Sequence, residues 1–114
     1  MSKNNIIKGV FCDIANTVID IMGNIDYEVL TILEEYERQE KKIHLWTSGN
    51  KEDVKRKFPV EIKNRWSVLS KYDFSGKKVE IMIDDESEEE IFAAYGIKCE
   101  QYINVIPKIL RKYL

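Results

Sequence analysis

The amino-acid sequence predicts an α/β protein in which helices cover both faces of a mainly parallel, Rossmann-like sheet. Short apolar runs rich in β-branched and aromatic residues alternate with amphipathic stretches of helical period. This alternation is typical of β–α–β units, whose crossovers put helices on both faces of a parallel sheet. A chain of 114 residues suffices for one core, so we expect residues 1–114 to form a single three-layer domain.

Five apolar runs are the predicted strands. The first, "KGVFC" at 8–12, is buried in character and ends at a polar turn. Further strands are expected at 42–46, at 66–70, where the pattern is weaker, and at 78–83. The segment 97–103 has the composition of a short edge strand.

Helices are expected between and after these strands, at 26–40, 50–58, 87–96 and 104–114. Asp26, Asn50 and Ser87 can cap the first three, because short polar side chains accept hydrogen bonds from first-turn N–H groups. Gly96 is a natural stop for the third. Pro107 is tolerated in the last helix only within its first turn.

Composition and charge restrict the class of protein. With 44% hydrophobic and 33% charged residues, the chain is expected to fold rather than remain disordered. A net charge of -2 argues against general electrostatic binding of nucleic acid, although a local basic patch is compatible with it. No signal peptide or membrane span is apparent, and Cys12 and Cys99 form no CxxC pair. We therefore expect a cytoplasmic protein without a membrane partner, for which a homo-oligomer is an open alternative.

Polar residues follow three of the predicted strands. Asp13 ends the first, Thr47 and Ser48 end the second, and Asp84 and Asp85 end the fourth. In a parallel sheet these ends share one edge, where ligands bind. Three clustered carboxylates repel one another unless a cation lies between them, and oxygen ligands suit Mg²⁺.

These strand ends resemble, in order, the motifs of the haloacid dehalogenase (HAD) superfamily of phosphohydrolases. The first family motif is an apolar strand followed by D-x-D-x-T, and "VFCDIANT" is similar to it at Asp13 and Thr17. "IHLWTSG" resembles the second motif through Thr47. "VEIMIDDE" resembles the fourth, which ends in paired acids, through Asp84 and Asp85.

The resemblance implies a phosphomonoesterase mechanism. Asp13 would attack phosphorus and become a transient aspartyl phosphate. Thr47 and the backbone N–H groups of Ser48 and Gly49 would hold the phosphoryl oxygens. The implied substrate is therefore a phosphorylated molecule.

A cofactor is implied as well. Mg²⁺ would be bound by Asp13, Asp84 and Asp85, together with the backbone carbonyl of residue 15. Since that contact uses the main chain, Ala15 can still provide it.

The third family motif is a lysine that neutralises the nucleophile and the phosphate. Lys71 fits best, because it follows a candidate strand. Lys77 and Lys78 are the alternatives, although they resemble a turn and a strand start.

Family members often carry a cap domain over the site. The segment 18–26 has room for only a small flap, and a helix, a strand and the lysine already occupy the stretch from Thr47 to Asp84. We expect a capless member with an open site, which is compatible with a macromolecular substrate.

Ala15 departs from the family pattern. The second aspartate of the first motif is the general acid and base, and alanine cannot replace it. The chain is a natural degenerate member, or the alanine was introduced deliberately to trap an intermediate. Phosphonoacetaldehyde hydrolases also have alanine there, but they need a lysine on a cap. We expect impaired or trapped turnover, and the alternative is a non-catalytic phosphate-binding or regulatory module.

Overall fold

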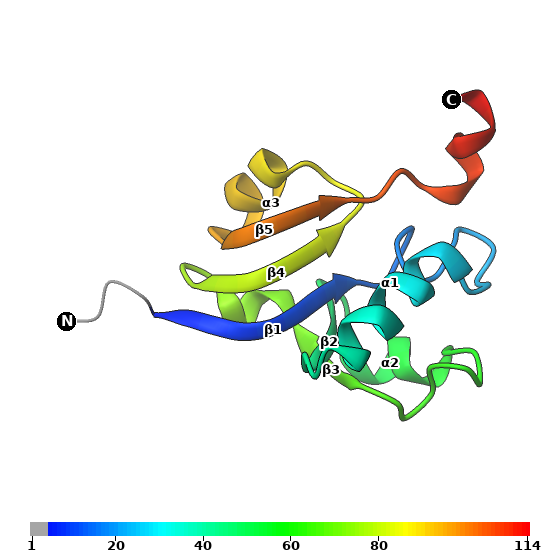
Figure 1. Cartoon of the computed structure of the whole chain (residues 1–114), viewed down its shortest axis with the longest axis horizontal. Coiled ribbons are helices and arrows are strands. Elements are labelled where there is room, and N and C mark those ends of the chain that lie inside the picture. Colours follow the sequence, from blue (N-terminus) through cyan, green and yellow to red (C-terminus); the bar gives the residue numbers. More distant parts are fainter. Residues whose placement is uncertain (1–4) are drawn as a thin grey trace.

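The computed structural model describes residues 5–114, and five strands form its sheet. They are β1 (Ile6–Asp13), β2 (Ile43–Thr47), β3 (Ser67–Ser70), β4 (Lys78–Asp84) and β5 (Lys98–Asn104). All neighbouring strands run parallel, in the order β3-β2-β1-β4-β5 (Figure 1). The predicted α/β class is confirmed, and each predicted strand is present with ends shifted by at most two residues.

The helices begin where the sequence places their caps. They are α1 (Tyr27–Arg38), α2 (Lys51–Arg56) and α3 (Glu88–Tyr95), with 3₁₀ helices η1 (Lys71–Phe74) and η2 (Lys108–Tyr113). The side chains of Asp26, Asn50 and Ser87 each accept a hydrogen bond from the backbone of the helix that follows. Gly96 ends α3 in the left-handed conformation. None of the helices within residues 5–114 combines the length and the apolar character needed to cross a membrane.

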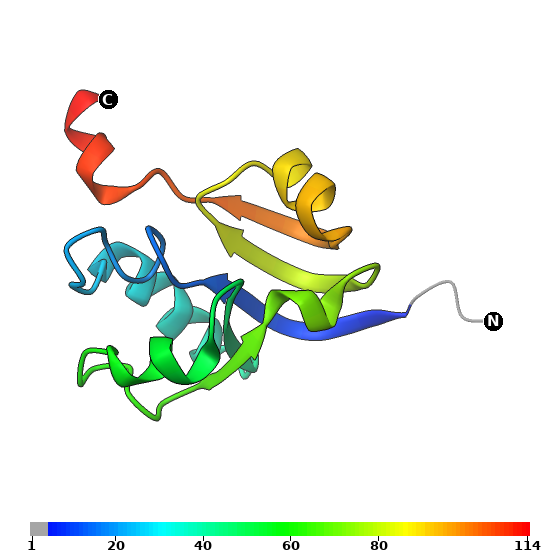
Figure 2. The same cartoon turned by 180° about the vertical axis from the view of Figure 1, so that it is seen from behind.

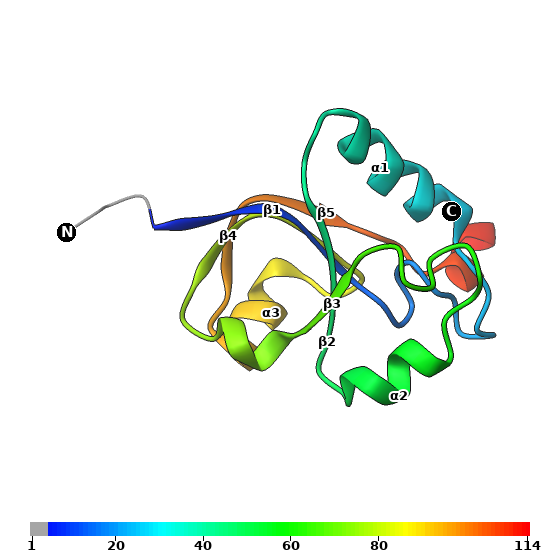
Figure 3. The same ribbon diagram turned by 90° about the horizontal axis from the view of Figure 1, so that it is seen from below.

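The sheet has a buried layer on each face. Val10 and Cys12 of β1 pack in a cluster that includes Leu33 of α1. Phe11, which points the opposite way, packs in a second cluster with Ile91 of α3. Figure 3 shows α1 and α3 on opposite sides of the strands. These clusters establish the three-layer arrangement that the alternating pattern predicts.

The C-terminal segment differs from the prediction. The α-helix expected over 104–114 is wrong: Asn104 still belongs to β5, and only the 3₁₀ helix η2 follows Pro107. Six residues without a side-chain cap are too few to stabilise an α-helix. Arg111 anchors the segment through an ion pair of 2.6 Å with Asp26. Figure 2 shows it at the end of the sheet to which the strand arrowheads point.

Strand β1 contains a β-bulge at Gly9. Its register with β4 shifts between Ile7 and Val10. Gly9 has φ +117, and its N–H donates a 2.8 Å hydrogen bond to Glu80. A Cβ atom at this position would lie 2.9 Å from the backbone oxygen of Lys42. Backbone conformation and space therefore both require glycine here.

Gly9→Ala is expected to lower the free energy of unfolding by about 1–3 kcal/mol, through backbone strain and the close approach to Lys42. Urea unfolding followed by circular dichroism measures this loss. Gly23→Ala is the matched control, because Gly23 also has positive φ but no atom within 4 Å of its added Cβ. Equal losses in the two variants would refute the steric argument.

Candidate functional site

The candidate site lies at the topological switch point of the sheet. From β1 the chain builds β2 and β3 on one side and then crosses to β4 on the other. Ligands of open α/β sheets bind at such points, outside the carboxyl ends of the strands. Cys12 of β1 pairs with Ile83 of β4, so Asp13 and Asp84 leave the sheet side by side.

Lys71 joins these two carboxylates. It is the first residue of η1, directly after β3. Its Nζ lies 3.1 Å from Asp13 Oδ1 and 3.1 Å from Asp84 Oδ2, and its side chain is 3% exposed. Lys77 and Lys78, by contrast, are exposed around the start of β4. Of the three candidate lysines, the structure brings Lys71 to the carboxylates.

A third carboxylate and a hydroxyl complete the cluster. One oxygen each from Asp13, Asp84 and Asp85 lie within 4.8 Å of one another. The hydroxyl of buried Thr17 lies 3.4 Å from Asp13 Oδ2, from Asp85 Oδ1 and from the carbonyl oxygen of Ala15. A hydroxyl donates only one proton, so Thr17 cannot donate to all three of these oxygens at once.

The charges of the cluster do not balance. If all three carboxylates were ionised, they and the one ammonium would carry a net charge of about -2. Burial and the neighbouring Asp84 raise the pKa of Asp13 to about 8, and burial raises the pKa of Asp84 to about 6. Burial acts to lower the pKa of Lys71, but attraction to Asp13 and Asp84 outweighs it and the pKa is raised. The site therefore retains protons or binds a further cation.

The donor set fits a hard divalent cation. Carboxylate and carbonyl oxygens are the ligands that Mg²⁺ and Ca²⁺ prefer. A charge of +2 would neutralise the surplus on Asp13, Asp84 and Asp85. Opposite ligands of Mg²⁺ are about 4.2 Å apart, so oxygens spaced at up to 4.8 Å would close slightly around that ion.

The end of β2 lies at the same edge. Trp46 is in register with Asp13, and Thr47 follows it. The Thr47 hydroxyl accepts a 2.9 Å hydrogen bond from the Gly49 N–H. Ser48 and Gly49 are exposed, and the Gly49 N–H is already donated to Thr47. A role of this turn in phosphate binding stays a prediction.

Ala15 lies on an exposed turn. It lies two residues beyond Asp13 and is exposed, whereas Asp13 is only 8% exposed. Asn16 takes φ 57, which turns the chain back so that Thr17 reaches the cluster. The following flap is small, with single bridges from Ala15 to Ile19 and from Ile19 to Ile25.

The end of β5 supports the acidic loop, which the sequence did not indicate. Asn104 donates a 2.8 Å hydrogen bond to the carbonyl oxygen of Glu86, which also accepts from the Tyr102 hydroxyl. The N–H of Val105 donates to the carbonyl oxygen of Asp84 at 2.8 Å. The feature of the sequence that could have indicated this support is the presence of polar residues at the end of the predicted edge strand.

Cys12 is a packing residue, as predicted. It is fully buried on the face of β1 that α1 covers. Burial raises the pKa of its thiol, so a nucleophilic thiolate is disfavoured.

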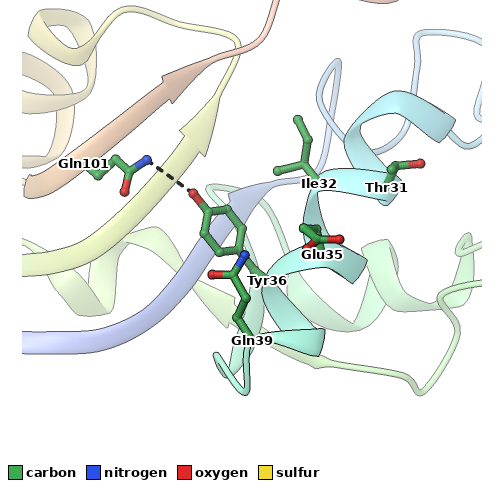
Figure 4. Close-up of a pocket in the computed structure, with 6 residues that line it drawn as sticks. All are labelled: Thr31, Ile32, Glu35, Tyr36, Gln39 and Gln101. Atoms are coloured by element: carbon green, nitrogen blue, oxygen red, sulfur yellow. Dashed lines mark hydrogen bonds between the residues drawn. The ribbon is translucent and has the colours of Figure 1, made fainter.

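A separate hollow of about 590 Å³ lies between α1 and β5 (Figure 4). It is lined by Thr31, Ile32, Glu35, Tyr36, Gln39 and Gln101. The Gln101 amide donates a 3.3 Å hydrogen bond to the Tyr36 hydroxyl across it. None of the carboxylates of the cluster borders it, so it is distinct from the candidate site.

Comparison with known proteins finds no protein-family model that matches the chain, and no curated protein or solved structure with significant similarity to it.

The raised pKa values predict a pH dependence of stability without metal. Asp13 titrates near 8 when folded and near 3.9 when unfolded, so the folded state binds the extra proton. The free energy of unfolding should therefore fall as pH rises from about 6 to about 8. Thermal unfolding in EDTA measures it.

Asp13→Asn is the control for this experiment. Burial lowers the pKa of His44, which acts in the opposite direction in both proteins. The decisive quantity is therefore the wild-type slope minus the Asp13→Asn slope, and it should be negative. A difference of zero or a positive one would contradict the raised pKa of Asp13.

Proposed function

We propose that the chain is a capless HAD-superfamily phosphohydrolase whose Asp13 accepts the phosphoryl group of a phosphomonoester as an aspartyl phosphate. The observation that carries this proposal is the buried Lys71, 3.1 Å from both Asp13 and Asp84 at the switch point. An ion pair serving stability alone gains little from such burial. A nucleophile next to a fixed cation, by contrast, is suited to phosphoryl transfer.

Each residue has a chemical role in this proposal. Asp13 is the nucleophile, because its carboxylate is at a strand end and part of it reaches solvent. Lys71 offsets the negative charge that nucleophile and phosphate bring together. The N–H groups of Ser48 and Gly49, with the Thr47 hydroxyl, would bind the phosphoryl oxygens once the hydrogen bond from the Gly49 N–H to Thr47 is exchanged for one to the phosphate.

Mg²⁺ is the proposed cofactor. Asp13, Asp84, Asp85 and the Ala15 carbonyl would hold it, and it would supply positive charge to the phosphoryl oxygens. Support comes from the spacing of the carboxylates and their surplus negative charge.

Ala15 limits turnover in this proposal. A carboxyl group there would give its proton to the leaving oxygen, and the resulting carboxylate would then activate water. Its loss is expected to cost about 10² to 10⁴ in rate. The same residue favours the second candidate, a regulatory module that binds phosphate without turning it over.

The proposed substrate is a phosphorylated molecule, and the size of the site's surroundings is compatible with a macromolecular one; the protein itself is proposed to be cytoplasmic. Between Thr47 and β4 the chain forms only α2, β3, η1 and their connections, and the flap at 18–26 is small. An open site of this kind admits a large substrate.

Ala15→Asp is expected to raise phosphatase activity about 10²-fold or more, because it restores a proton donor beside Asp13. The gain should be larger for glycerol phosphate than for p-nitrophenyl phosphate, whose leaving group needs little protonation. Steady-state hydrolysis with Mg²⁺ measures both.

Asn16→Asp is the matched control, since it adds the same charge one residue further along and should give no gain. A folded Ala15→Asp protein that hydrolyses neither substrate would favour the regulatory module.

A further inference from the structure

We propose that the protein with Ala15 is a phosphoacceptor charged by acyl phosphates, in which Asp13 takes the phosphoryl group from a donor with a carboxylate leaving group and retains it. This inference rests on the proposed function. It adds the class of donor and replaces catalytic turnover with a lasting modification.

The acceptor itself is intact. Asp13 Oδ1 contacts the Lys71 ammonium, and Oδ2 lies beside the Thr17 hydroxyl. The Asp13 side chain is 12% exposed, compared with 0% for Asp84. Of these two carboxylates, Asp13 is the one that a donor can reach.

Within residues 5–114, the position two residues after Asp13 carries no group that can donate a proton to a leaving group. Ala15 offers a methyl group where a carboxyl would stand. The ammonium of Lys71 is directed to two carboxylates. The Thr17 hydroxyl already faces three acceptor oxygens. We therefore expect Asp13 to react with donors whose leaving group can depart without accepting a proton.

The acidity of the leaving group defines that class. A carboxylic acid has a pKa of about 4 and a phenol about 10, and an aliphatic alcohol is weaker still. A carboxylate is therefore stable as it leaves at pH 7, whereas an alkoxide is not. Acyl phosphates meet the condition and alkyl phosphates fail it.

The free energy of phosphoryl transfer favours the same class of donor. An oxygen of Asp13 forms a bond to phosphorus, the donor's P–O bond breaks, and its electron pair leaves with the carboxylate. With Asp13 ionised, as it would be beside a bound cation, no proton moves, and one acyl phosphate is exchanged for another, so the step is nearly balanced in free energy. Transfer from an alkyl phosphate to Asp13 is unfavourable in free energy. It would proceed only if rapid hydrolysis removed the aspartyl phosphate.

The product should persist. Its hydrolysis needs an activated water, and the group that would activate it is absent at Ala15. A positioned base contributes about 10² to 10⁴ to such a step. The phosphorylated protein should therefore outlive that of an Ala15→Asp variant by at least tenfold.

Intact-protein mass spectrometry tests the proposal. Full-length protein is incubated with Mg²⁺ and acetyl phosphate, and in parallel with glycerol phosphate. One added phosphoryl group is expected with acetyl phosphate and none with glycerol phosphate. Asp13→Asn should stay unmodified, while Asp73→Asn, which changes an exposed acid on η1, should be modified like the wild type.

The outcomes separate this inference from the proposed function. If acetyl phosphate leaves the wild type unmodified while Ala15→Asp hydrolyses phosphate esters, the phosphoacceptor inference is wrong and the proposed function stands. Modification of Asp13→Asn, or equal modification by glycerol phosphate, also overturns it. If Ala15→Asp is inactive and no adduct forms, both fail.

Discussion

The buried ammonium of Lys71 is the interaction on which the candidate site depends. Two carboxylates, Asp13 and Asp84, can lie side by side at the ends of neighbouring strands only because a cation 3.1 Å from each offsets their repulsion. Burying such charges costs several kcal/mol per ion unless they are paired. One ammonium balances only one of the three carboxylates, so the cluster is short of positive charge when all three are ionised. The cluster can offset that deficit by retaining protons or by holding a metal ion, for which its three carboxylates are suitably close.

The topology of the sheet fixes where this cluster forms. Because β4 crosses to the far side of β1, the two acidic strand ends meet at the switch point. The short η1 then brings Lys71 back from β3 to both carboxylates. The end of β5 braces the loop after Asp84 through Asn104. The site is therefore built at the ends of strands and at the start of η1, and Ala15 stands on an exposed turn beside it.

Local patterns predicted much of this structure. Strand ends, caps and the stop at Gly96 follow from chemistry within a few residues, which is why they were predictable. The convergence of Asp13, Asp84 and Asp85 followed from the rule that parallel strands share a carboxyl edge. The central position of Thr17 and the bracing by Asn104 depend on contacts between distant segments, which periodicity does not encode. The prediction of an α-helix over 104–114 was wrong because a start at Pro107 followed by an apolar pattern is equally compatible with a short 3₁₀ helix.

The binding of Mg²⁺ tests the central claim most directly. A ligand that binds only the folded state raises its stability, by about 2.7 kcal/mol at a hundredfold excess over Kd. Millimolar Mg²⁺ should therefore raise the melting temperature of the wild type and of Asp73→Asn, which leaves the cluster intact. Asp84→Asn should abolish the shift, because it removes one of the three carboxylates that would bind the cation. An unchanged melting temperature in the wild type, or an equal shift in Asp84→Asn, would contradict the account.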